Sequence, residues 1–317
     1  MRAIIINNFG GRDQLQMAER PRPVPGKGEV LIRVRAAGVN PVDTKICGGY
    51  LRFRLPHMFP IILGWDAAGV VEELGPGCKR FKAGDEVFAY CRKALVMHGT
   101  YCEFIAVDEK NVALKPTKLS FDEAAAIPLA GLTAWQSLTE AGEISRGQRV
   151  LIHAAAGGVG GYAVQIARNK GCRVIATASA ANHDLVKSLG AHEVIDYTQT
   201  DFVTAVREKY PDGLDVVFDT VGGEVQERSA GVLKPGGKLV SILAFAKEAE
   251  LRAKGADCRY VFVRPEGRQL AKLAKLADAG KLKVTLAATL PLEEAAKAHE
   301  MIDSRHTRGK IVLKIAN

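Results

Sequence analysis

The 317-residue sequence lacks several features that would place it in a special class of proteins. Its six cysteines lie far apart and form no Cys-x-x-Cys pair, which argues against a structural zinc site and against a disulfide framework. No segment has a biased composition or a short repeat. The apolar run within residues 1–8 is too short for a signal peptide. We therefore expect a folded protein of the cytoplasm, a reducing compartment.

The sequence also has few long apolar runs and no strong charge bias. The most apolar window, residues 150–167, approaches the length of a membrane span, but it contains His153 and four glycines, which suit a phosphate-binding turn better. The net charge is +9, and residues 1–60 hold 10 Lys and Arg against 4 Asp and Glu. Such an excess can attract nucleic acid or an anionic ligand. A solvated surface is the simpler explanation, so we expect neither a membrane nor a nucleic acid as partner.

The order of the expected elements indicates two domains. About the first 115 residues contain short strands separated by Gly and Pro turns, as in residues 29–36 and 69–75. From Ser120, which begins a capping box with Glu123, strands and helices alternate, as they do in a doubly wound parallel sheet. The expected elements of this part include a helix over residues 133–141, a strand over 193–196, a helix over 202–209 and a loop over 244–255. The last strand, residues 310–315, has no helix of its own and could rejoin the N-terminal sheet.

These patterns predict an α/β protein in which one domain interrupts the other. Residues 121–265 are expected to form a Rossmann dinucleotide-binding domain. Residues 1–120 and 266–317 are expected to form the discontinuous, mainly-β domain around it.

A glycine turn between a strand and a helix is the strongest local signal for a cofactor. The apolar strand at residues 150–153 runs into Ala155, Gly157, Gly158, Val159 and Gly160, and an apolar helix follows. Gly157 lets the backbone approach a pyrophosphate, and Gly160 lets the helix pack closely on the strand. The free N–H groups of the helix start would bind the phosphates. These five residues are therefore predicted to bind a dinucleotide.

The end of the next strand indicates which dinucleotide is bound. An NAD site places Asp or Glu there to bind the ribose 2′-hydroxyl, whereas this strand ends at Ala178 and Ser179 without an acid. Ser179 can donate to a 2′-phosphate, and His183 and Lys187 are the nearest cations. We therefore expect NADPH as the cofactor.

Taken together, the motifs resemble the zinc-independent quinone oxidoreductase (zeta-crystallin-like) branch of the medium-chain dehydrogenase/reductase superfamily. The resemblance covers nearly the whole chain and implies that the β-rich domain is GroES-like. It rests on the glycine turn and on residues 36–43 (AAGVNPVD), 64–71 (GWDAAGVV), 84–87 (GDEV), 129–135 (LAGLTAW), 188–191 (SLGA), 219–223 (DTVGG) and 308–313 (RGKIVL).

The resemblance also implies what this chain has lost. In the zinc alcohol dehydrogenases of the superfamily, a Cys ligand stands at the position of Asn40, and Gly-His-Glu stands where this chain has Gly64-Trp65-Asp66. We therefore expect no metal. Without a metal to polarise a ketone, a conjugated acceptor is easier to reduce, because the charge spreads to an oxygen that hydrogen bonds can stabilise.

Further site residues follow from the resemblance alone. Asn40 and Tyr50 would lie beside the nicotinamide and the substrate, where Asn40 donates a hydrogen bond and Tyr50 orients the substrate or relays a proton. Alternatively, Asn40 is a turn residue before Pro41 and Tyr50 a packed loop aromatic. The remaining implied cofactor contacts are Thr133, Tyr197, Val221, Ile242, Ala244, Phe262 and Val263. Thr133 could instead cap a helix.

The sequence thus predicts hydride transfer from NADPH to a quinone or an α,β-unsaturated carbonyl, held in the cleft between the two domains. One-electron and two-electron quinone reduction both remain open. A homodimer is implied by the resemblance. A catalytically weak family member that binds nucleotide or RNA is the main alternative, and a redox-sensing regulator is another.

Overall fold

The computed structural model describes residues 1–304 and 307–315 and divides into two compact units. The first comprises residues 1–132, 264–280 and 284–317, and the second comprises residues 133–263 and 281–283. The division falls at residue 132 and not at 120, because helix α2 (Phe121–Ala125) packs on strands of the first unit. The assignment of catalytic and cofactor-binding roles to the two domains stays a prediction.

The first unit is built mainly from β-strands. Its larger sheet has the order β15-β16-β3-β5-β6-β8, with β7 also paired to β3, and a smaller sheet has the order β2-β1-β4. The strands are β1 (Arg2–Ile6), β2 (Gln16–Glu19), β3 (Glu29–Val39), β4 (Ile61–Ile62), β5 (Asp66–Leu74), β6 (Glu86–Tyr90), β7 (Phe104–Asp108), β8 (Val112–Leu114), β15 (Leu286–Pro291) and β16 (Lys310–Lys314). Helices α1 (Pro41–Cys47), α2, α9 (Gly267–Asp278) and α10 (Ala295–Asp303) pack around them.

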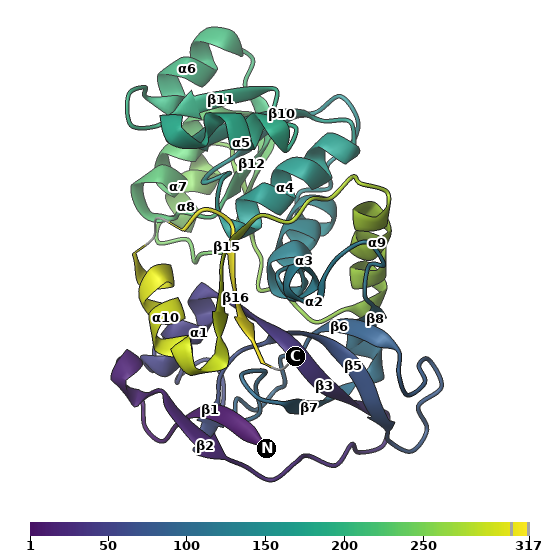
Figure 1. Ribbon diagram of the computed structural model, residues 1–317. Coiled ribbons are helices and arrows are strands. Elements are labelled where there is room, and N and C mark those ends of the chain that lie inside the picture. The colour runs from purple at the N-terminus through teal and green to yellow at the C-terminus, as the bar shows by residue number, and fades with distance from the viewer. Residues whose placement is uncertain (305–306, 316–317) are drawn as a thin grey trace. The chain divides into compact units, whose positions relative to one another are not determined.

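Strand β16 returns from the far end of the chain to the N-terminal sheet. It pairs antiparallel with β3, and Ile311 lies opposite Val39. Figure 1 shows the yellow β16 beside the purple β3. The prediction that the last strand rejoins the first sheet is confirmed, and the pairing brings Lys310 next to the residues that follow β3.

The second unit contains one parallel sheet with the order β11-β10-β9-β12-β13-β14. In sequence order this is 3-2-1-4-5-6, the strand order of a dinucleotide-binding Rossmann domain. The strands are β9 (Arg149–Ile152), β10 (Arg173–Ala178), β11 (Glu193–Asp196), β12 (Leu214–Asp219), β13 (Leu233–Ser241) and β14 (Asp257–Tyr260). The predicted α/β fold with a GroES-like and a Rossmann domain is confirmed.

Helices cover the parallel sheet and give it a core. They are α4 (Gly158–Asn169), α5 (His183–Ser188), α6 (Phe202–Lys209), α7 (Gly223–Ser229) and α8 (Glu248–Ala253). Helices α6, α7 and α8 share one apolar core with the sheet, which includes Leu151, Val217 and Leu239. Right-handed crossovers place α4 and α5 on the other face. Both faces of the strands are therefore apolar, as expected for a parallel sheet.

The strand order changes direction between β9 and β12, which are direct neighbours. Open α/β sheets bind ligands at such a switch point, beyond the carboxyl ends of the strands. The glycine turn follows β9, and the segment 219–223 follows β12. Two of the sequence motifs therefore meet at the position where this fold binds nucleotides.

Candidate functional site

The glycine turn joins β9 to α4 and leaves the start of the helix open. Ala154 has a positive φ of 49°, and the amide of Gly157 donates to the carbonyl of Ala154 at 3.0 Å, so the chain turns sharply. Gly157 is the N-cap of α4, and no described side chain caps the helix. The first N–H groups of a helix have no partner within it. The amides that follow Gly157 are thus available to an anion such as a pyrophosphate.

Two positions of this turn carry glycine for different steric reasons. A Cβ atom at Gly160 would lie 2.3 Å from the carbonyl oxygen of Ala154, so the helix could not pack here with a side chain at this position. A Cβ atom at Gly157 would lie 3.3 Å from the same oxygen, which is tight but tolerable inside the protein. Gly157 therefore leaves space for an external group, and Gly160 serves close packing.

Asp219 holds the turn on the other side of the switch point. Its Oδ1 atom accepts hydrogen bonds from the amides of Val221 and Gly222, both at 2.9 Å. Its Oδ2 atom accepts from Gln226 Nε2 at 3.0 Å and from Ser241 Oγ at 2.7 Å. Because Asp219 is fully buried, this cluster ties the ends of β12 and β13 together.

His153 packs beneath the glycine turn. Its Nδ1 atom lies 3.1 Å from Thr177 Oγ1 and its Nε2 atom lies 3.0 Å from Ser229 Oγ, so both ring nitrogens have partners. Burial lowers the pKa of His153 to about 4, and the ring is neutral near pH 7. His153 therefore packs beneath the turn as a neutral ring that bonds to Thr177 and Ser229.

The residues expected around the 2′-phosphate follow two neighbouring strands. Ser179 follows β10 and its Oγ atom accepts from Asn182 Nδ2 at 3.0 Å, while His183 Nε2 lies 3.3 Å from the carbonyl of Ala178. Tyr197 follows β11 and is 59% exposed.

The same corner holds a carboxylate from the neighbouring strand β11, which the sequence of β10 does not reveal. Asp196 ends β11 in register with Ala178. Its Oδ1 atom accepts hydrogen bonds from the amide and the hydroxyl of Thr198, which lower the pKa of the carboxyl group. A negative charge therefore lies near the corner where a 2′-phosphate would bind.

The remaining predicted contacts also lie in the second unit. Val221, which follows β12, is 46% exposed, whereas Ala155 and Thr133 are buried. Ile242 and Ala244 follow β13, and Phe262 and Val263 follow β14. Since all six strands are parallel, the predicted residues after them lie along one edge of the sheet. Their contact with a cofactor stays a prediction.

In the first unit, Asn40 belongs to a buried polar network. Its Nδ2 atom donates to Asp66 Oδ2 at 2.9 Å, and its Oδ1 atom accepts from Lys310 Nζ. Lys310 Nζ also donates to the carbonyl of Val39 at 2.8 Å and lies 3.8 Å from Asp66 Oδ2. Asn40 is only 1% exposed. Its side chain therefore does more than end a turn before Pro41, because three strand ends meet on it.

A second part of this network surrounds Asp43. The carboxylate accepts from the amide of Asn40 at 2.8 Å and from the Tyr101 hydroxyl at 3.0 Å. Tyr101 in turn lies 3.5 Å from His299 Nε2. Burial raises the pKa of Asp43 to about 7 and that of Asp66 to about 6. Asp43 is thus a structural acceptor that fixes the backbone of Asn40.

Tyr50 lies outside this network. It is 79% exposed and belongs to the turns after α1, together with Phe53, which is 89% exposed. The alternative that Tyr50 is packed in its loop is wrong. A catalytic role for Tyr50 stays a prediction.

The residues that could bind a metal ion do not cluster in the part of the chain that the structure describes. No group of three or more His, Cys, Asp or Glu side chains there could hold a metal ion. Trp65 is buried against Tyr90, with ring centroids 6.0 Å apart. The donors near Asn40 do not suit zinc, because the amide oxygen already accepts from an ammonium group.

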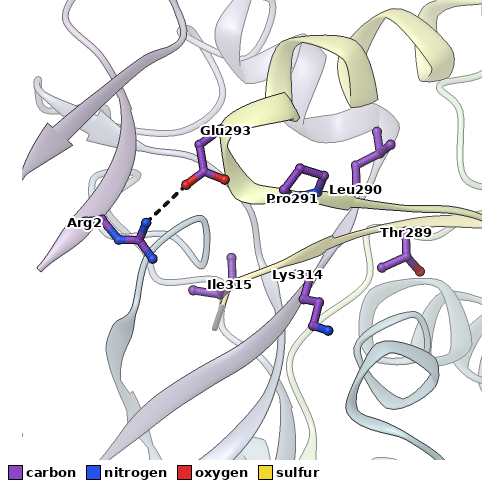
Figure 2. A pocket seen from close by; sticks show the side chains of 7 residues that line it. All are labelled: Arg2, Thr289, Leu290, Pro291, Glu293, Lys314 and Ile315. Atoms are coloured by element: carbon purple, nitrogen blue, oxygen red, sulfur yellow. Dashed lines mark hydrogen bonds and ion pairs between the residues drawn. The ribbon is translucent and has the colours of Figure 1, made fainter. Parts of the chain in front are cut away.

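Within the described residues, no helix is long and apolar enough to cross a membrane. A surface hollow of about 380 Å³ lies in the first unit near β15 and β16, crossed by an ion pair of 3.2 Å between Arg2 and Glu293 (Figure 2). Its other lining residues are Thr289, Leu290, Pro291, Lys314 and Ile315. None of them was predicted as a site residue.

Known proteins resemble the chain over its full length. Residues 26–117 match the family described as alcohol dehydrogenase GroES-like domain, and residues 189–313 match the family described as zinc-binding dehydrogenase. The chloroplastic NADPH-dependent alkenal/one oxidoreductase of Arabidopsis thaliana is 35% identical, with 99% of this chain and 79% of that protein aligned. The chain belongs to the medium-chain dehydrogenase/reductase superfamily. It is an oxidoreductase of that superfamily.

Solved structures of medium-chain reductases have the same fold. The quinone oxidoreductase of Coxiella burnetii has a TM-score of 0.89 at 36% identity and covers 100% of this chain and 99% of its own. The quinone oxidoreductase of Escherichia coli in complex with NADPH has a TM-score of 0.89 at 31% identity and covers 99% of this chain and 100% of its own. The resemblance to this superfamily is therefore confirmed.

Several residues that shape the site were not predicted from the sequence. Lys310 and Asp66 were noted only as parts of motifs, although both contact the Asn40 network. Gln226 and Ser241 were not singled out, although both bond to Asp219. A buried polar residue at the end of a strand was the available signal, because such a residue needs partners.

Proposed function

We propose that this chain is an NADPH-dependent, zinc-independent oxidoreductase that transfers hydride to a quinone or to an α,β-unsaturated carbonyl. The observation that carries the proposal is the glycine turn at the switch point of the 3-2-1-4-5-6 sheet. The uncapped start of α4 fits a pyrophosphate, and Gly157 leaves room for its approach. Bound NADPH would supply the hydride.

The residues after the other strands would position the two ends of the dinucleotide. Val221, Ile242, Ala244, Phe262 and Val263 lie along the same sheet edge and would hold the nicotinamide and its ribose. Ser179, His183 and Tyr197 would surround the adenosine 2′-phosphate, with Thr133 supporting the nicotinamide face. The Asp219 cluster would keep Val221 in place. Ala155, Gly158, Val159 and Gly160 would complete the phosphate cradle.

The contacts of the Asn40 amide favour a quinone or an enone as the hydride acceptor. An amide that bonds to Lys310 and Asp66 is a poor metal ligand, but it can donate a hydrogen bond to an oxygen. Negative charge that develops on the oxygen of a quinone or an enone can be stabilised in this way. Tyr50 would orient the acceptor or deliver a proton. The carbonyl of a simple ketone would be activated less well.

The test is a kinetic assay of the purified protein with both nicotinamide cofactors. We expect oxidation of NADPH at 340 nm with quinones and with enones, unchanged after treatment with a chelator. Absence of turnover with every acceptor, or activity that requires zinc, contradicts the proposal. Detection of a semiquinone would assign one-electron reduction, and its absence two-electron transfer. Retention on RNA that falls steeply with salt and competes with NADPH would instead support a binding protein.

The preference for NADPH can be tested at the corner after β10. We expect kcat/KM for NADPH to exceed that for NADH, and we expect Asp196→Asn to increase the ratio, because it removes a negative charge near the 2′-phosphate. Asp184→Asn, on the exposed first turn of α5, is the matched control. A wild-type preference for NADH would reverse the cofactor assignment. We also expect a homodimer, which sedimentation would measure. Its expected location is the cytoplasm.

A further inference from the structure

We propose that Lys310 is a positioning residue of the active site, which holds the Asn40 amide in one orientation and places its ammonium group behind it. The inference rests on the proposed function, because it takes Asn40 to lie beside the substrate. Lys310 is the first residue of β16 and Asn40 follows β3, so the pairing of these two strands brings the two side chains together.

The partners of Asn40 determine which way its amide points. Lys310 donates to Oδ1 on one side, and Asp66 Oδ2 accepts from Nδ2 at 2.9 Å on the other side. If the amide were rotated by half a turn, its NH₂ group would face an ammonium and its oxygen would face a carboxylate. Both contacts would be repulsive, so the two charged residues select a single orientation.

One N–H of the Asn40 amide has only a weak partner within the protein. The NH₂ group has two hydrogens, and one of them is used by Asp66 at 2.9 Å. The other has the carbonyl of Gly38 as its partner at 3.5 Å, which is long for a hydrogen bond. A substrate oxygen can compete with so weak a partner. A hydrogen bond from Lys310 to Oδ1 makes the N–H groups of the same amide stronger donors.

Burial of the charges argues that the network has a role beyond folding. Lys310 is 4% exposed and Asp66 is completely buried. Removing such charges from water costs free energy, and apolar residues of similar volume often stabilise a fold as well or better. Lys314, on the same strand, is exposed, so its charge stays in contact with water and carries no such free-energy cost. A buried ammonium behind the predicted donor is therefore better explained by catalysis than by stability.

The chemistry at this position needs a positive charge. When hydride reaches a conjugated acceptor, negative charge develops on the acceptor oxygen, and donors that are already oriented stabilise it most. In the zinc-containing relatives a metal ion would supply the charge. Here Lys310 would supply it indirectly through Asn40, so the ammonium need not touch the substrate.

The experiment compares five enzymes under saturating NADPH with one enone and one quinone. They are the wild type, Lys310→Met, Asn40→Ala, the double variant of these two substitutions, and Lys314→Met as the control. We expect Lys310→Met to lower kcat by roughly 10- to 100-fold with KM values within about threefold, because an interaction specific to the transition state is lost. The double variant should be no slower than Asn40→Ala alone, because Lys310 acts through Asn40. Lys314→Met should keep the wild-type kcat.

A second variant separates catalysis from a misfolded network. Lys310→Met combined with Asp66→Asn removes the ammonium together with the carboxylate that lies 3.8 Å from it. We expect this variant to fold and to have the same kcat as Lys310→Met. When the transferred hydrogen of NADPH is deuterium, the isotope effect on kcat should be larger than in the wild type. Recovery of the wild-type kcat in Lys310→Met/Asp66→Asn would overturn the proposal. Additive losses of kcat in Lys310→Met/Asn40→Ala would also overturn it.

The outcome for Lys310 can be separated from that for the proposed function. If the wild type reduces no acceptor, the proposed function fails. If the wild type is active and Lys310→Met is equally active, only the role of Lys310 fails. Fluorescence titration of NADPH provides the remaining readout, and we expect equal affinities in the wild type and Lys310→Met.

Discussion

At the scale of single residues, Gly160 and Gly161 are adjacent in α4 but differ in their surroundings. A Cβ atom at Gly160 would meet the carbonyl oxygen of Ala154 at 2.3 Å, whereas one at Gly161 would first meet Leu189 Cδ1 at 3.4 Å. We expect Gly160→Ala to destabilise the protein by about 1–3 kcal/mol, because the helix must move away from the strand. The affinity for NADPH should fall at least roughly tenfold, or about 1.4 kcal/mol.

The control is Gly161→Ala, which should keep both properties. Chemical unfolding and fluorescence titration measure them. Equal effects of the two substitutions would contradict the assignment of Gly160 to close packing, and would leave general helix disturbance as the explanation.

His153 gives the protein a dependence on pH that follows from its burial. Its pKa falls to about 4 in the folded protein, from 6.5 in the unfolded chain. Above pH 6.5 the neutral ring suits both states, and between pH 6.5 and 4 only the unfolded chain takes up the proton. The stability contribution is therefore present above pH 6.5 and is lost as the pH falls toward 4.

We expect His153→Gln to lose less unfolding free energy than the wild type between pH 6.5 and 4, by on the order of 3 kcal/mol. Urea unfolding at a series of pH values measures this difference. Parallel curves for His153→Gln and the wild type would show that the ring is not buried in its neutral form.

Residues whose role is local could be predicted from the sequence, and those that depend on distant partners could not. Gly157 and Gly160 were recognised because strand, turn and helix follow each other directly. The bond between Lys310 and Asn40 joins residues 270 positions apart, and no periodicity reports such a pairing. Asp196 was overlooked for a related reason, because it reaches the 2′-phosphate corner from the neighbouring strand.

At the scale of elements, the turn after β12 depends on a side chain of α7. Gln226 donates to Asp219 Oδ2 at 3.0 Å and to Ser241 Oγ at 2.9 Å. We expect Gln226→Leu to cost about 1–3 kcal/mol of stability, because the buried carboxylate loses a partner. The Kd for NADPH should rise as Val221 loosens.

The matched control is Glu224→Gln, on the exposed first turn of the same helix, where an ion pair contributes little. Calorimetry and cofactor titration provide both readouts. If Gln226→Leu matched the control, the Asp219 cluster would not be what holds this turn.

Among the elements, strongly patterned ones were predicted closely and others were displaced or missed. Strand β11 and helix α6 have the expected bounds. The helix expected over 133–141 begins earlier, at Pro128, because proline is well tolerated in the first turn of a helix, and it continues as a π-helix over Ser137–Ala141. The segment 244–255 was expected to be a loop and contains α8, whose six residues are too few to show a period.

At the scale of the whole molecule, cofactor binding should appear as increased resistance to heat. A ligand that binds only the folded state at 100 times its Kd adds about 2.7 kcal/mol to stability. We expect the unfolding temperature to rise with NADPH and to rise less with NADH at the same concentration. Differential scanning calorimetry measures both. The variant Gly160→Ala should lose about half of the NADPH response or more, and an equal response to both cofactors would count against a 2′-phosphate site.

The return of β16 to β3 also has a consequence for biosynthesis. Residues 133–263 form one continuous stretch, so the Rossmann unit can fold while the ribosome is still at work. Lys310 is made 270 residues after Asn40, or roughly 15–50 s later at usual translation rates. During that interval residues 36–39 of β3 lack their partner strand, and Asn40 lacks its ammonium partner. A nascent chain would therefore acquire its nucleotide pocket first and its reductase chemistry last, with an unprotected strand for chaperones to shield in between.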